Sequence, residues 1–177
     1  GGANRLQFET VPAGLPDVDV VVQAKVNFTA TGSIQIGGRI QLTMPDVNAG
    51  ALFPVAAHGW RFENTSEPVA VQFIEPSHSR PNATNVVISN VTAGEPRQMT
   101  LTIAGQSIPE GAAIVLQVFS GLRTPSAPIA PDTKMILDTF DSEAKIIDET
   151  TEMGTDRVCC CAPGTVHKFG NSTTCQK

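Results

Sequence analysis

The chain has 177 residues, of which 41% are hydrophobic and 16% are charged, and it contains 13 prolines and 15 glycines. This length suits one domain with a sizeable core and an appendage, and the composition favours a turn-rich, all-β protein over a disordered or helical one. The net charge of −5 includes no basic cluster, which excludes nucleic acid as a partner because phosphate neutralisation needs grouped Lys and Arg.

The N-terminal part of the chain predicts a short strand and then a long one. Residues 6–10 form the short strand, which Pro12 and Pro16 separate from the long strand. From Val20 to Ala30 apolar and polar residues alternate, with Val20, Val22, Ala24, Val26 and Phe28 on one face and Gln23, Lys25, Asn27 and Thr29 on the other. We therefore expect Asn27 to point to solvent.

Further strands are predicted at short intervals, with turn residues between them. The expected ranges are 39–44, 58–62, 69–74, 85–91, 98–104 and 113–120. The polar interval 75–84 is expected to be an exposed loop. The strand at 113–120 is apolar on both faces, which predicts a central, buried strand. This succession is typical of a β-sandwich.

The stretch from 113 to 148 is expected to connect the two sheets of that sandwich. We predict a turn at Gly121, then an extended polyproline-II crossing through Pro125, Pro128 and Pro131, then a strand that ends within 138–142. Residues 143–153 are the one segment that competes as a helix, although their apolar positions are few.

These patterns divide the chain into three regions. Residues 1–17 form an N-terminal arm, residues 18–150 an immunoglobulin-like β-sandwich, and residues 151–177 a cysteine-rich tail that begins a small disulfide module. No apolar run approaches the roughly 20 residues that a membrane span needs, and the N-terminus lacks the layout of a signal peptide. We therefore expect a mature or excised segment of a longer chain.

Five of the eight asparagines match the acceptor motif for N-linked glycosylation: Asn27, Asn64, Asn82, Asn90 and Asn171. The Ser and Thr content would place about one asparagine in this motif by chance. Any single match is compatible with an unmodified asparagine, but the set indicates a glycoprotein of the cell surface or extracellular space.

All four cysteines, Cys159, Cys160, Cys161 and Cys175, lie in the tail. A body without cysteine followed by a cysteine-dense tail is typical of a domain joined to a disulfide module in an oxidising compartment. Adjacent cysteines rarely bond to each other, so at most one of the triplet pairs with Cys175 and the other two need partners elsewhere. A zinc site that includes His167 is the alternative, but the spacing of structural zinc modules is missing.

No catalytic constellation is predicted, and the chain is not expected to be an enzyme or to hold a cofactor or metal. Histidine occurs only at positions 58, 78 and 167, and no Gly-x-Ser-x-Gly motif accompanies it. The acidic residues Asp138, Asp141, Glu143 and Asp148 have oxygen ligands for calcium but no EF-hand-like spacing. They are interpreted as a solvated acidic hairpin.

Several short motifs, in order, resemble a domain repeated in mastigoneme-type surface proteins of algae, oomycetes and other protists. The matching residues are 26–29 (VNFT), 37–45 (GGRIQLTMP), 108–111 (IPEG), 121–126 (GLRTPS) and 138–142 (DTFDS). Phe140 departs from the tyrosine that is more often expected there. The tail from Cys161 to Cys175, with its Cys-Ala-Pro-Gly-Thr start, resembles a cysteine-rich repeat similar to those of ephrin receptors. The two resemblances imply an extracellular, multi-domain glycoprotein that builds hairs, fibrils or a surface coat.

These features predict a structural subunit that assembles with copies of itself into a filament, through strand-edge and arm contacts and disulfides. The donated element is the arm strand, with Leu6 and Phe8 as its candidate contact residues. Attached N-glycans would shield the remaining surface. The alternative is a monomeric adhesin or carbohydrate-binding module, for which Trp60 is the candidate stacking platform, although a partly buried loop anchor is the favoured role for this residue.

Overall fold

The computed structural model describes residues 7–11, 16–46, 58–63, 69–91, 95–129, 133–154, 166–167 and 175–176. Within these ranges all regular structure is β-strand, which confirms the all-β prediction. The same ranges contain no helix with the length and apolarity that a bilayer crossing requires.

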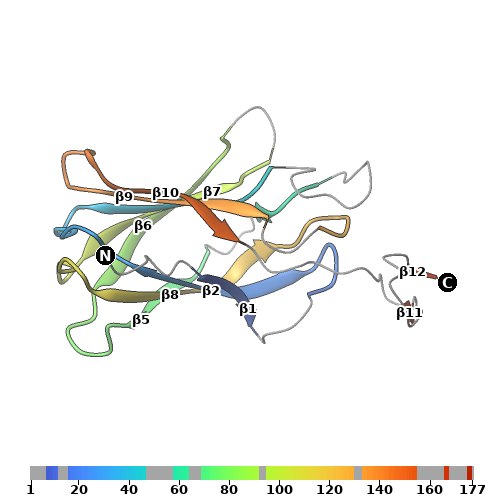
Figure 1. Ribbon diagram of the computed structural model, residues 1–177, viewed down its shortest axis with the longest axis horizontal. Helices are drawn as coiled ribbons and strands as arrows, with labels where there is room; N and C mark the ends of the chain where they lie inside the picture. Colours follow the sequence, from blue (N-terminus) through green and yellow to red (C-terminus); the bar gives the residue numbers. More distant parts are fainter. Residues whose placement is uncertain are drawn as a thin grey trace.

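The strands form two antiparallel sheets that stack face to face (Figure 1). The first sheet contains β1 (Gln7–Val11), β2 (Val21–Thr29), β4 (Arg61–Phe62), β5 (Val71–Glu75) and β8 (Ala113–Arg123). The second runs in the order β10 (Ile146–Gly154), β9 (Lys134–Phe140), β3 (Arg39–Thr43), β7 (Gln98–Ala104) and β6 (Asn82–Ser89). A separate two-stranded pair joins β11 (Val166–His167) to β12 (Cys175–Gln176). The fold is therefore a two-sheet β arrangement.

The alternation of apolar residues places one core between the sheets. Ala24, Val26 and Phe28 of β2 are buried, and so are Ile40 and Leu42 of β3. The residues between them on each strand are half-buried or exposed. Because successive side chains of a strand point to opposite faces, the two-residue period predicted for 20–30 assigns the inward face of β2 correctly.

β8 is the central strand of the first sheet, as predicted from its two apolar faces. It pairs with β2 on one side and with β4 and β5 on the other. The expected turn at Gly121 is wrong, because the strand continues to Arg123 and pairs again with β2. Gly121 has a φ of 78° and lies in a bulge, where β8 carries extra residues between two successive contacts with β2. A glycine with positive φ here bends the strand without reversing it.

The segment after β8 carries the chain to the other sheet, as predicted. β8 belongs to the first sheet and β9 to the second. Pro125 and Pro128 lie on this connection, whereas Pro131 falls outside the described residues.

Two further expectations are corrected. Residues 143–153 are not a helix, since β10 pairs with β9 through a hairpin. Asp141 closes that hairpin, because its Oδ1 accepts the backbone N–H groups of Glu143 at 2.9 Å and Lys145 at 2.8 Å.

Asn82 does not lie in the expected loop but is the first residue of β6, where it lies opposite Ala104 of β7.

Candidate functional site

β1, the predicted assembly arm, lies at the edge of its own chain's first sheet. It pairs with β2 along its whole length, from Gln7 opposite Asn27 to Val11 opposite Gln23. Phe8 is 3% exposed and meets Trp60 edge to face, with ring centroids 5.6 Å apart and ring planes at 82°. Leu6, the other predicted arm residue, lies outside the described residues. The arm strand thus contributes an aromatic side chain to the core.

Trp60 is the residue that receives Phe8. It is 1% exposed, so it is a fully buried anchor and not the partly buried one that the sequence favours. A ring this buried cannot stack on a sugar, and the carbohydrate-binding alternative loses the platform on which it depended. The indole N–H of Trp60 has no hydrogen-bond partner among the described residues. An unpaired buried donor costs about 1–3 kcal/mol, and packing against Phe8 and the core offsets that cost.

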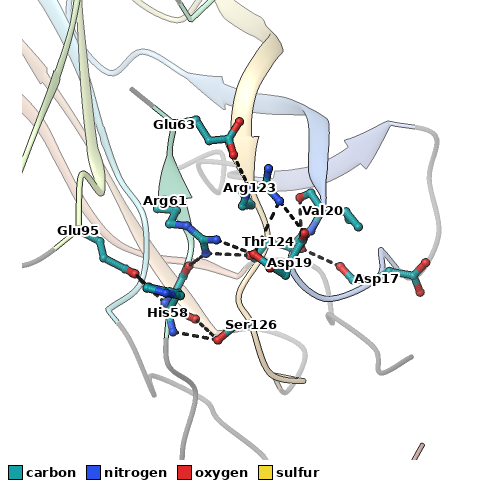
Figure 2. A network of polar contacts seen from close by, with 11 residues as sticks. Asp17, Asp19, Val20, His58, Arg61, Glu63, Glu95, Arg123, Thr124 and Ser126 are labelled. Carbon is teal, nitrogen blue, oxygen red and sulfur yellow. Dashed lines mark hydrogen bonds and ion pairs between the residues drawn. The ribbon is translucent and has the colours of Figure 1, made fainter. Parts of the chain in front are cut away.

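A polar cluster holds the segment on either side of Trp60 (Figure 2). We use this name for Asp19, His58, Arg61, Glu63, Glu95, Arg123, Thr124 and Ser126. Its centre is Asp19, just before β2, whose Oδ1 accepts from Nη2 of Arg61 at 2.5 Å. Nη1 of Arg123 lies 3.7 Å from the same oxygen and donates to the carbonyl of Asp19 at 2.7 Å. Arg123 also pairs through Nε with Glu63.

Thr124 extends the cluster toward the loop before β2. Its buried hydroxyl donates to the carbonyl oxygen of Asp17 at 2.7 Å and accepts from the backbone N–H of Val20 at 3.0 Å. The end of β8 is therefore fastened to the start of β2.

The other side of the cluster fixes the backbone before Trp60. Nδ1 of His58 contacts the Glu95 carboxylate, and the second oxygen of Glu95 accepts the N–H of Gly59 at 2.9 Å. The hydroxyl of Ser126 accepts the backbone N–H of His58 at 2.9 Å. This serine is bonded to the main chain of His58 and not to the imidazole, so the group does not have the geometry of an activated nucleophile.

Opposite charges lie next to each other in the polar cluster. The hydrogen bond from Arg61 is the largest effect and lowers the pKa of Asp19. Burial is the next largest and raises it, and the charges of Arg61, Arg123 and His58 each lower it by less. Asp19 is therefore ionised at neutral pH. Because Asp19 and Glu63 pair with Arg61 and Arg123, the cluster is suited to hold the strand ends together.

The predicted glycosylation sites lie in different surroundings. Asn82 and Asn90 are exposed, at the start of β6 and just after its end. Asn27 lies on the outer face of β2 as predicted, but it is half-buried between β1 and β8, and its Oδ1 is buried without a hydrogen-bond partner among the described residues. The expectation that Asn27 is freely exposed is corrected in this respect. Asn64 and Asn171 fall outside the described residues.

The tail and the acidic hairpin offer no assembled metal site in the described part of the chain. Cys159, Cys160 and Cys161 lie outside the described residues, whereas Cys175 in β12 pairs through its backbone with His167 in β11. Asp148, predicted as part of a solvated hairpin, is buried and bonded to threonine side chains.

Sequence reasoning missed the polar cluster and the contact between Phe8 and Trp60. Arg61 and Asp19 are 42 positions apart, and Arg123 and Asp19 are 104 apart. No spacing rule connects such residues. The one usable signal is that the lone tryptophan sits in a short segment flanked by His58 and Arg61, which are costly to bury unless they are paired.

No protein-family model matches the chain, and no curated protein matches it in sequence.

Proposed function

We propose that this protein is a structural subunit of an extracellular glycoprotein filament or surface hair, in which β1 of one copy pairs with β2 of the next. The observation that carries the proposal is the place of Phe8, a core aromatic supplied by a short edge strand. Such a strand makes the same contacts whether it comes from its own chain or from a neighbour. Head-to-tail exchange of identical strands produces an open filament when the rotation does not close a ring.

Three features support the exchange. β1 is held by pairing with β2 alone within the sheet. Pro12 and Pro16 favour an extended linker that can reach a neighbouring molecule. The polar cluster fixes the segment that carries Trp60, which keeps the receiving surface in place for an incoming Phe8.

We also propose that the sandwich is immunoglobulin-like and that the cysteines of the tail link successive subunits or modules. The support for the fold is that consecutive parts of the chain alternate between the two sheets, so that β8 lies between β2 and β4 and β3 lies between β9 and β7. N-glycans on the exposed asparagines complete the proposed surface. The order of motifs that resembles mastigoneme-type proteins supports the same function.

The experiment is to delete residues 1–11 and examine the product by negative-stain electron microscopy. We expect filaments to be lost, because the deletion removes both β1 and Phe8. A matched control is deletion of residues 1–5, which leaves β1 intact and should preserve filaments. A synthetic peptide of residues 1–11 should bind the truncated chain and yield a capped monomer, which shows that the truncated domain is folded. Filaments of normal length from the 1–11 deletion would contradict the proposal.

A further inference from the structure

β6 differs from the other edges of the two five-stranded sheets in having no charged residue. It pairs with β7 on one side, and no described strand pairs with its other side. The other edge strands of the two five-stranded sheets each carry a charge: Glu9 in β1, Arg61 in β4, Glu75 in β5 and Glu149 in β10. Charged side chains commonly prevent an edge from pairing with another chain. β6 lacks that protection.

The residues that β6 does contain favour pairing with another strand. Its sequence, NATNVVIS, contains only small, amide and β-branched side chains. Ala83, Val86 and Ile88 pack on the core, while Val87 is 56% exposed on the outer face. Val91, just beyond the strand, is 40% exposed. An uncharged, β-branched strand with a free edge is a template for pairing with a further strand.

Two glycosylation motifs bracket this strand. Asn82 is its first residue and Asn90 directly follows its last, and both are exposed. At about 3.3 Å per residue they lie roughly 25 Å apart along the strand. Asn82 also lines a hollow of about 480 Å³ between β5 and β6, which a glycan at this position would cover. Because an N-glycan is bulky and hydrophilic, one at each end would block the approach of another strand.

We propose that glycans on Asn82 and Asn90 protect the β6 edge, and that a chain lacking them pairs with a second copy through antiparallel contact between the two β6 strands. This inference rests on the proposed function only in requiring that the protein is glycosylated. A second copy is the fitting partner because two β6 strands carry no charge and meet without repulsion, whereas an antiparallel self-pair of β1 centred on Glu9 would place two like charges opposite each other.

The geometry of β6 also sets the strength and form of this pairing. A bulge interrupts the ladder between Thr84 and Val87, with Asn85 at a φ of 47°. Only short runs on either side are regular, so the association is weak and depends on concentration. Pairing of the same surface on both copies gives a closed dimer. The product therefore differs in size from an open filament built by β1 exchange.

The test uses the full chain secreted from eukaryotic cells, with intact mass to verify occupancy and light scattering over a concentration series. The variant is Asn82→Gln with Asn90→Gln. We expect the molar mass of this variant to double as concentration rises. If the variant is part of a larger assembly, the molar mass of the smallest repeating unit should double instead. The wild-type chain should show no such doubling. Asn64→Gln with Asn171→Gln removes the same number of motifs elsewhere and should behave as wild type. Trimming of folded wild-type protein with an endoglycosidase, which leaves one sugar on an uncharged asparagine amide, should reproduce the doubling without any substitution.

Adding Val87→Lys to the doubly substituted chain should abolish the doubling, because it puts a charge on each of the two edges that would pair. This change does not touch β1, so loss of filaments and loss of the β6 dimer are separable results. The proposal is overturned if Asn82 and Asn90 are unmodified in the secreted chain. It is also overturned if removal of their glycans leaves the association state unchanged, or if Val87→Lys fails to reverse the doubling.

Discussion

Asp148 joins the two sheets through a buried carboxylate. Its Oδ1 accepts the backbone N–H of Thr31 at 3.1 Å and also the hydroxyl of that residue, and its Oδ2 accepts the hydroxyl of Thr139 at 2.6 Å. Thr31 follows β2 of the first sheet, whereas Asp148 and Thr139 lie on β10 and β9 of the second. Hydrogen bonds to a charged group are each worth about 1.5–3 kcal/mol, so this residue fastens the sandwich at one end.

Replacement of Asp148 by alanine should lower the free energy of unfolding by about 3 kcal/mol, because it leaves the buried hydroxyl of Thr139 and the N–H of Thr31 without their acceptor. Glu149, its exposed neighbour, is the matched control, and Glu149→Ala should change stability by less than about 0.5 kcal/mol. Urea titration of both variants measures the difference. Equal midpoints for the two would show that Asp148 does not hold the sheets together.

The role of Asp148 could not be predicted from the sequence. Its nearest acidic neighbours made it look like one member of a solvated hairpin, and its partner Thr31 is 117 positions away. Asp141, by contrast, does act within that hairpin, through local bonds to Glu143 and Lys145. Local turn chemistry is therefore readable from sequence, whereas a bond between sheets is not.

At the scale of the strand, the bulge in β8 shows what a single glycine does. Gly121 has a positive φ, and a Cβ on it would lie 2.8 Å from Cγ2 of Val69. Gly111 has a similar φ of 75° but open space around its missing Cβ. The two positions separate the cost of the backbone conformation from the cost of the steric contact.

We expect Gly111→Ala to cost about 1 kcal/mol for the left-handed conformation alone. Gly121→Ala should cost about 3 kcal/mol, because the overlap with Val69 is added to the same backbone term. Thermal or urea unfolding of the two variants provides the comparison. A larger loss at Gly111 than at Gly121 would contradict this account of the bulge.

Strand positions were predicted well where one face is buried. The expected range 98–104 coincides with β7, and the alternation at 20–30 locates β2 to within a residue at each end. The predictions failed where pairing with a neighbouring strand decides the structure. Residues expected to compete as a helix form β10, because β9 supplies a hairpin partner. β6 begins within the expected loop at Asn82, because that residue lies opposite Ala104 of β7. Side-chain period identifies a face, but the extent of a strand also depends on its neighbour.

At the scale of the whole molecule, the surface around Trp60 and the arm strand β1 that packs on it are held by one set of contacts. The polar cluster fixes the backbone around Trp60, Trp60 packs against Phe8, and Phe8 is carried by the edge strand β1. The sequence predicted that residues 6–10 are separable from the body, because Pro12 and Pro16 come after them. It could not predict that the arm residue would find the lone tryptophan, since that contact depends on the complete fold.

The most direct test of strand exchange asks which molecule supplies β1. Glu9 and Lys25 lie directly opposite each other on β1 and β2, at a spacing that a disulfide can bridge. One sample carries only Glu9→Cys and the other only Lys25→Cys, and the two are mixed under assembly conditions and oxidised. A chain with both substitutions serves as the positive control.

Peptide mapping then looks for a disulfide between positions 9 and 25. In the mixture this bond can form only between two molecules, because no single chain has both cysteines. Exchange of β1 between copies predicts the bond in assembled material from the mixture. Its absence there, alongside its presence in the doubly substituted control, would show that each β1 stays in its own chain.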